Sequence, residues 1–194
     1  MKDALPMTGE PLALDLVNTR PNGSNGPVDL LGTPDQLAAW LAAQVERLPE
    51  LTPAELATVT EEDLAAVRAV REHVSAAIHA VRLDTRPPVA ALRGLNDAQR
   101  AAPPIRELGW AGESITLTAR RDGPLGQRLA AVFAEAAAGL LADPAAGRIR
   151  ECEATECVMV FLPAHPRRRW CSPARCGNRS RVARYYQRHR PELS

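Results

Sequence analysis

The four cysteines of this chain lie in one short segment near its C-terminal end, and they constrain its fold more than any other feature. They form two close pairs, Cys152 with Cys157 and Cys171 with Cys176, and the preceding 151 residues contain no cysteine. Two pairs joined by a short spacer can present four thiolates to one tetrahedral Zn²⁺, because each pair supplies two sulfurs and the spacer folds back. The spacing therefore predicts one structural zinc ion bound by these four residues.

Two disulfide bridges are the main alternative, since four cysteines in a secreted domain would form them. Residues 1–10 hold no apolar core of the length that a secretory signal needs, so we expect the protein to remain in the reducing cytosol, where bridges are rare. His165 or His189 could replace a ligand, but a four-cysteine set is complete without them. Four sulfurs leave no coordination position open, so we do not expect zinc-based catalysis.

The composition allows one mid-sized domain and a small module, because the chain has 194 residues and 45% apolar content. It contains no run of about 18 apolar residues, so we expect no membrane span. The net charge of +1 hides an asymmetry: residues 1–147 carry 13 basic and 19 acidic side chains, whereas residues 148–194 carry 11 arginines and 4 glutamates. The two segments should therefore face different partners.

Most of the chain before the cysteines shows helical signals. Thr33, Thr52 and Thr60 each stand where a helix N-cap is expected, with a glutamine or an acidic residue three positions later. Apolar side chains then recur at helical spacing in three longer segments, 64–81, 89–95 and 125–140. This pattern predicts a mainly α-helical N-terminal domain.

One segment of that domain departs from the helical pattern. Residues 114–118 alternate polar and apolar side chains with β-branched enrichment, which predicts a strand and half of a small β-hairpin. Residues 144–147 mark the domain boundary but are too short for a flexible tether. We therefore predict a helical sensor or partner domain over residues 1–147 and a closely packed zinc module over residues 148–194.

The first apolar segment, residues 11–19, favours a short helix and carries three polar side chains. Asp15, Asn18 and Thr19 either line a ligand pocket or tie the segment to the helices through buried hydrogen bonds, and we favour the hydrogen bonds. Residues 1–147 show no nucleophile–base motif and no glycine-rich phosphate loop. We therefore do not expect an enzyme.

The zinc module has a recognisable order of elements. Residues 158–161 form a short β run after the first cysteine pair, and Arg168–Trp170 is its expected hairpin partner. A helix then begins near the fourth cysteine, where the positive end of its dipole stabilises thiolate charge. This order predicts a treble-clef-like Zn(Cys)₄ fold.

Two motifs resemble known families. The segments Arg169-Trp-Cys-Ser172 and Cys176-Gly-Asn-Arg179 resemble the CGNR-type zinc finger, and residues 12–19 resemble the opening of the ABATE-type helical domain often found before that finger. The resemblance implies a bacterial, stress-induced transcription regulator in the cytoplasm. It also implies that the finger binds DNA while the helical domain senses an effector or contacts a partner.

Arginines dominate the zinc module. From Val158 to the end there are nine arginines, one acidic residue and no lysine. Guanidinium groups bind phosphate oxygens and guanine edges, so this density indicates DNA binding, with RNA as an alternative. The candidate residues are Arg167, Arg168, Arg169, Arg175, Arg179, Arg181, Arg184 and Arg188.

Other interpretations of the module stay open. Arg179 is equally suited to bind backbone carbonyls near the cysteines, and we favour a core position for Tyr185 and Tyr186 over base stacking. The whole arginine face could instead contact the acidic domain, which would make the protein a protein-interaction module with an architectural zinc finger. A homodimer is a further expectation, because a lone finger gains specificity on paired half-sites.

Overall fold

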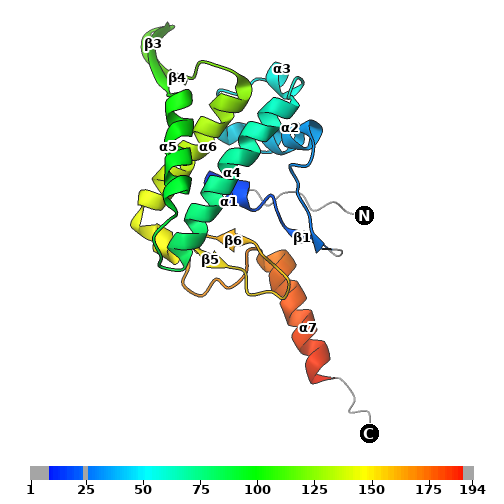
Figure 1. Ribbon diagram of the computed structural model, residues 1–194. Helices are drawn as coiled ribbons and strands as arrows, with labels where there is room; N and C mark the ends of the chain where they lie inside the picture. Colours follow the sequence, from blue (N-terminus) through cyan, green and yellow to red (C-terminus); the bar gives the residue numbers. More distant parts are fainter. Residues whose placement is uncertain (1–8, 24–25, 190–194) are drawn as a thin grey trace.

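The computed structural model describes residues 9–23 and 26–189, except for the side chains of residues 187 and 188. The described residues form seven α-helices, which are labelled in Figure 1. They are α1 (Leu12–Val17), α2 (Pro34–Ala42), α3 (Pro53–Leu56), α4 (Glu61–Arg82), α5 (Val89–Ala101), α6 (Leu125–Ala142) and α7 (Asn178–Arg188). Two 3₁₀ segments, η1 (Val45–Arg47) and η2 (Pro144–Arg148), and one π-helical turn, η3 (Pro173–Gly177), join them.

The strands form three antiparallel pairs of two strands each. They are β1 (Asn22–Gly23) with β2 (Gly26–Pro27), β3 (Ile105–Ala111) with β4 (Ser114–Arg120), and β5 (Arg150–Glu151) with β6 (Val160–Phe161). The fold is therefore mainly α with a small β-hairpin, as predicted.

The predicted helix starts are confirmed by their caps. The Thr60 hydroxyl accepts the N–H of Asp63, whose carboxylate accepts the N–H of Thr60 in return, so a capping box begins α4. Thr52 begins α3 in the same way, and Thr33 caps α2. These contacts satisfy N–H groups that have no partner within the helix.

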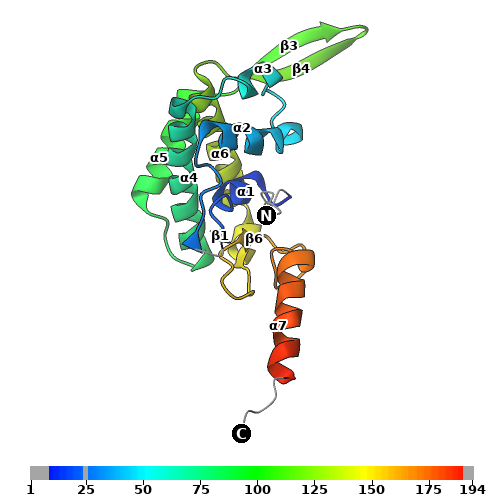
Figure 2. The ribbon, with the colours of Figure 1, turned by 90° about the vertical axis from the view of Figure 1, so that its right-hand side faces the viewer.

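Helices α4, α5 and α6 lie side by side and form the core of the helical body, which we define as the described residues up to Gly147 (Figures 1 and 2). The helices α4 and α6 approach closely where they begin. A Cβ atom at Gly126 would lie 2.8 Å from the Cα of Asp63, so only glycine permits this approach. The N–H of Gly126 donates to Asp63 Oδ1 at 2.6 Å, which joins the two helix starts.

Helix α6 is the one described helix with the length and composition of a membrane span. Its Phe133, Ala134 and Ala137 are fully buried among the other helices. A core helix of this kind meets the same criteria because it is apolar on most of its surface.

The strands β3 and β4 form a hairpin that extends away from the helices, at the end opposite to α7 (Figures 1 and 2). Gly112 and Glu113 make its turn, and Gly112 has a φ of 61°. A glycine at the first central position with positive φ is typical of a type II′ turn, which matches the twist of the strands. The predicted strand over residues 114–118 is therefore confirmed.

The predicted hairpin partner of the β run after the first cysteine pair is wrong. The strand β6 pairs with β5, which precedes the first cysteine. Residues 168–170 contribute one backbone hydrogen bond to this region, from the N–H of Glu153 to the carbonyl of Arg169. Pro163 and Pro166 explain the difference, because they remove backbone donors from the segment that leads to Arg168.

Candidate metal centre and arginine surface

The four cysteine sulfurs meet at one point in the C-terminal module, which we define as residues 148–189. All four lie within 4.8 Å of one another, and the closest pairs are 3.5, 3.7 and 3.8 Å apart. A tetrahedron with Zn–S bonds of about 2.3 Å has S···S edges of about 3.8 Å. No pair is bonded as a disulfide. The donor set therefore fits one structural zinc ion.

Local backbone structure brings the sulfurs together. Glu156 adopts a φ of 62°, which turns the chain between Cys152 and Cys157. The N–H of Cys171 donates to the sulfur of Cys152 at 3.3 Å, and this bond stabilises a thiolate. Cys176 lies in the turn that leads into α7, so the positive end of that helix is close to its sulfur.

The thiol pKa values show what a cation must do at this site. A hydrogen bond from Cys171 lowers the pKa of Cys157 to about 5, although burial opposes this. The pKa of Cys171 is raised because its thiol donates to Cys157, and burial with neighbouring negative charge raises the pKa of Cys176 to about 11. Four crowded thiols therefore do not all ionise at neutral pH on their own, whereas a divalent cation offsets their mutual repulsion.

The module is attached to the helical body by Asn18. Its side-chain amide donates to the carbonyl of Val160 at 2.8 Å, and its oxygen accepts the N–H of Val160 at 2.9 Å. Both bonds are buried, and they pair the free side of β6 as another strand would. The position of the module therefore depends on the side chain of the residue that caps the C-terminus of α1.

Asp15 and Thr19 also make buried contacts within the protein. Asp15 forms an ion pair with Arg47 at 2.6 Å and accepts the N–H groups of Gly9 and Glu10. The hydroxyl of Thr19 donates to Leu16 and accepts from Arg71 at 2.8 Å. With Asn18, these residues form the hydrogen-bonded arrangement favoured above, and none of the three lines the pocket described below.

Three of the candidate arginines have partners within the module or, for Arg168, also on the helical body. Arg168 forms an ion pair with Glu10, donates to the Cys171 carbonyl at 2.6 Å and lies over the Phe161 ring. Arg169 pairs with Glu153. Arg179 donates to the Thr155 carbonyl at 3.1 Å and lies 3.8 Å from the Cys176 sulfur, as its structural interpretation predicted. These residues support the metal centre.

The remaining candidates with described side chains are exposed. Arg167 and Arg175 are exposed, and their side chains make no hydrogen bond or ion pair within the described residues. Arg181 and Arg184 are exposed on α7 and donate to backbone carbonyls one turn earlier. The side chain of Arg188 lies outside the described part of the chain. We call Arg167, Arg175, Arg181 and Arg184 the arginine surface.

The expectation that Tyr185 and Tyr186 belong to a core is wrong. Both side chains are exposed, as is Val182, because α7 extends away from the rest of the protein (Figures 1 and 2). Tyr185 stacks on His189 with 4.2 Å between ring centroids. The arginine surface is therefore accompanied by exposed aromatic rings, and the sequence of α7 contains no acidic residue.

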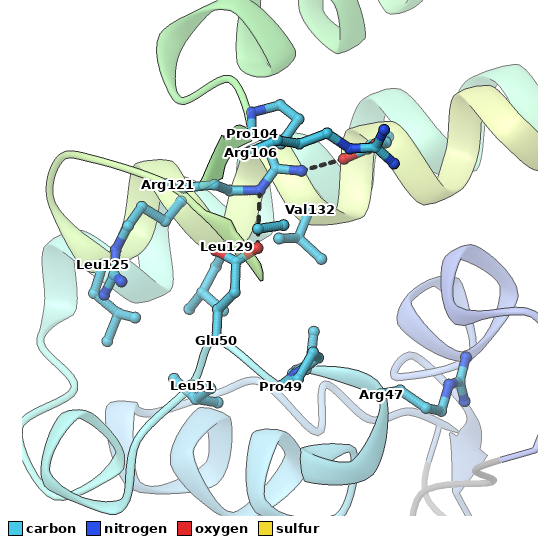
Figure 3. Close-up of a pocket in the computed structure, with 14 residues that line it drawn as sticks. Arg47, Pro49, Glu50, Leu51, Pro104, Arg106, Arg121, Leu125, Leu129 and Val132 are labelled. Carbon is cyan, nitrogen blue, oxygen red and sulfur yellow. Dashed lines mark hydrogen bonds and ion pairs between the residues drawn. The ribbon is translucent and has the colours of Figure 1, made fainter. Parts of the chain in front are cut away.

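The structure also contains a pocket that sequence reasoning missed. It has a volume of about 300 Å³ and lies between α6, the base of the β3–β4 hairpin and residues 47–51 (Figure 3). Its walls are largely apolar and include Leu48, Leu51, Leu125, Leu129 and Val132. Three distant segments build it, and no local motif in the sequence indicates that they meet.

Arg121 is the buried member of the charged residues that line this pocket, which also include Arg47, Glu50, Arg106, Arg128 and Glu135. Its side chain is buried, donates to the Ala102 carbonyl at 2.6 Å and forms an ion pair with Glu135. Its Nε–H makes no hydrogen bond in the described chain and lies 3.9 Å from Glu50 (Figure 3). Buried polar groups are normally hydrogen-bonded, so this donor is suited to an oxygen atom of a ligand.

Comparison with known families agrees with these observations. A family model described as "Putative stress-induced transcription regulator" (ABATE) matches residues 10–144, and the CGNR zinc finger model matches residues 148–189. A search of curated proteins found no match. Because the first match covers well over half of the chain, the protein belongs to the ABATE family, and its C-terminal module is a CGNR zinc finger that binds one structural zinc ion.

Proposed function

We propose that the protein is a transcription regulator that binds DNA through its zinc finger. The observation that carries this proposal is α7, an exposed helix without acidic residues that leaves the zinc centre with arginines and tyrosines on its surface. Arginine suits phosphate oxygens and guanine edges, and an α-helix fits the major groove of DNA. The family description supports the same role.

The zinc ion has a structural part in this function. It fixes the turn before α7 and so sets the direction in which the arginine surface points. With four sulfur ligands it has no open position for water or substrate, and we propose no enzymatic activity. Free thiols and a metal ligand set of this kind suit the cytoplasm, where we place the protein.

Replacing Arg181 and Arg184 together with alanine should weaken binding to duplex DNA by roughly tenfold or more, because charge-assisted contacts to phosphates are lost. The slope of log affinity against log salt should also decrease in magnitude by about 2. Fluorescence anisotropy with a labelled duplex at several salt concentrations measures both quantities.

The matched control replaces Arg86 and Arg93, which are exposed on the helical body, and it should bind DNA like the wild type. Unchanged affinity of the Arg181/Arg184 variant with zinc retained would contradict the proposal. Absence of binding to duplex DNA even at low salt would favour the protein-interaction alternative, and preferential binding to duplex RNA would redirect the proposal to RNA.

We also propose that the pocket beside Arg121 binds the effector. The apolar walls and the unpaired Nε–H donors of Arg121 and Arg128 suit a small apolar molecule with an oxygen acceptor. Benzoate and benzamide are a matched pair of probes, because they differ in charge and share the ring and the oxygen. Binding stabilises the folded state, so an effective probe should raise the Tm.

Filling the pocket with the substitution Val132→Trp should abolish this increase in Tm. The control Val89→Trp adds the same bulk on an exposed position of α5, outside this pocket, and should keep the increase. If neither probe raises the Tm of the wild-type protein at millimolar concentration, or if Val132→Trp keeps the full response, effector binding in this pocket is wrong.

A further inference from the structure

The β3–β4 hairpin, which we call the arm, has one apolar and one polar face. In its register, Leu108 lies opposite Leu117 and Trp110 lies opposite Ile115, and such cross-strand partners point to the same side. The pairs that alternate with them point to the other side and are mainly polar: Glu107 with Thr118 and Gly109 with Thr116. The arm is therefore as amphipathic as a strand pair that covers a core.

The apolar face of the arm covers nothing in the described protomer. The exposed fractions of its large side chains are 76% for Leu108, 71% for Trp110, 68% for Ile115 and 55% for Leu117. Together they expose roughly 500 Å² of apolar surface, near the upper end of the largest patch on ordinary monomers. A patch of this size and continuity indicates a protein interface.

Some charged side chains of the arm form ion pairs within the protomer, whereas two others do not. On the polar face, Arg120 forms ion pairs with Glu107 and Asp122, so these charges are already compensated. Arg106 lies at the base of the apolar face, opposite Ala119, and Glu113 lies at the tip. Neither of these two side chains has an ion-pair partner within the described chain.

We propose that the arm associates with the arm of a second copy of this chain. When two identical arms pack face to face and antiparallel about a two-fold axis, the tip of each lies at the base of the other. Glu113 of each copy then meets Arg106 of its partner, and the Leu108–Leu117 and Trp110–Ile115 pairs meet near the axis. The same arrangement therefore pairs the free charges and buries the exposed apolar side chains.

The available area agrees with a reversible dimer. Two arms bury roughly 1,000 Å² through these four side chains on each copy, and contacts beside the arm base add to this. Stable specific interfaces bury about 1,200 Å² or more, so the arm interface lies just below that range, among weak and transient interfaces. We therefore expect a dimer that dissociates in the micromolar range.

Sedimentation equilibrium of the zinc-loaded full chain tests the proposal between about 1 and 200 µM. The wild-type protein should shift from monomer to dimer, and Leu117→Lys should remain monomeric throughout. The matched control Thr118→Lys adds the same charge to the polar face one residue away and should still dimerise. At concentrations where the wild type is monomeric, both variants should keep its Tm, because both side chains are exposed in the protomer.

A charge exchange distinguishes this pairing from other modes of association. Arg106→Glu and Glu113→Arg should each weaken the dimer several-fold by placing like charges together, and the double variant should recover most of the loss. A wild-type protein that is monomeric at every concentration overturns the proposal, as does a Leu117→Lys variant that dimerises normally. Failure of the double variant to recover overturns the antiparallel arrangement.

Discussion

Replacing Cys171 with serine is expected to unfold the zinc finger and leave the helical body folded. The small cluster inside the finger contains three of the four cysteines and few other buried side chains: Ala154, Met159 and Phe161. Binding of structural zinc by such modules supplies on the order of 10 kcal/mol of folding free energy at neutral pH. The body has its own core of leucine, valine, alanine and phenylalanine, which does not depend on the metal.

Metal analysis and limited proteolysis measure this outcome. The zinc content should fall from one ion per chain to nearly none, and trypsin should quickly cleave the finger at its many arginines while the body resists. The control Ser172→Ala removes the hydroxyl that caps the turn before α7, at a cost of about 1 kcal/mol, and should keep its zinc. A Cys171→Ser protein with full zinc content and a protected finger would overturn the assignment of the metal site.

The substitution Arg71→Leu should cause the next largest loss of stability. The Arg71 side chain is completely buried and donates to both carboxylate oxygens of Asp29, at 2.7 and 2.6 Å, and to Thr19. Without it, the partly buried Asp29 carboxylate has lost its main partner, which costs about 3 kcal/mol in comparable cases. For a chain of this length the Tm should decrease by roughly 10 °C.

Arg20→Leu is the matched control for this prediction. Arg20 also lies within ion-pair distance of Asp29, at 3.6 Å, but its side chain is 45% exposed. Exposed pairs contribute less than about 1 kcal/mol, so this variant should melt within a few degrees of the wild type. Equal destabilisation by the two substitutions would contradict the importance of the buried guanidinium.

The ion pair between Arg71 and Asp29 makes the stability of the fold depend on pH. Partial burial acts to raise the pKa of Asp29, but hydrogen bonds from Arg71 and Leu31 and the charges of Arg71 and Arg20 outweigh it and lower the pKa to about 2. Because the pKa is lower in the folded state, the ionised Asp29 carboxylate stabilises the fold at pH values above its unfolded pKa of about 4. This stabilisation is lost as the pH falls toward 2. The stability advantage of wild type over Asp29→Asn should therefore shrink between pH 5 and pH 2 in urea denaturation.

Local signals in the sequence were sufficient to predict the helices and the metal site. The N-caps at Thr52 and Thr60 act through residues three positions away, and the cysteine pairs report directly on the chemistry of their ligand set. Interactions of this range are visible in a linear pattern. The pairing of β6 with β5 was missed because β5 is only two residues long and shows no strand period.

The surroundings of individual side chains were harder to predict. The spacing of Val182, Tyr185 and Tyr186 is the same for a core helix and for an exposed one, and only the direction of α7 decides between them. The same limit applies to Arg168, whose partner Glu10 is 158 residues away. Long-range contacts of this kind depend on the tertiary fold and leave no local trace.

The arm and α7 leave the helical body at opposite ends, which under the proposed DNA binding would determine how far apart the bound sites lie. In a dimer joined through the arms, each helical body lies between the two-fold axis and its own zinc finger. The length of α4, about 33 Å, indicates how far each body separates the finger from the axis. The fingers are then separated by much more than the 34 Å of one DNA turn. Such a dimer would recognise operator halves that are several turns apart, or would hold two distant sites together across a DNA loop.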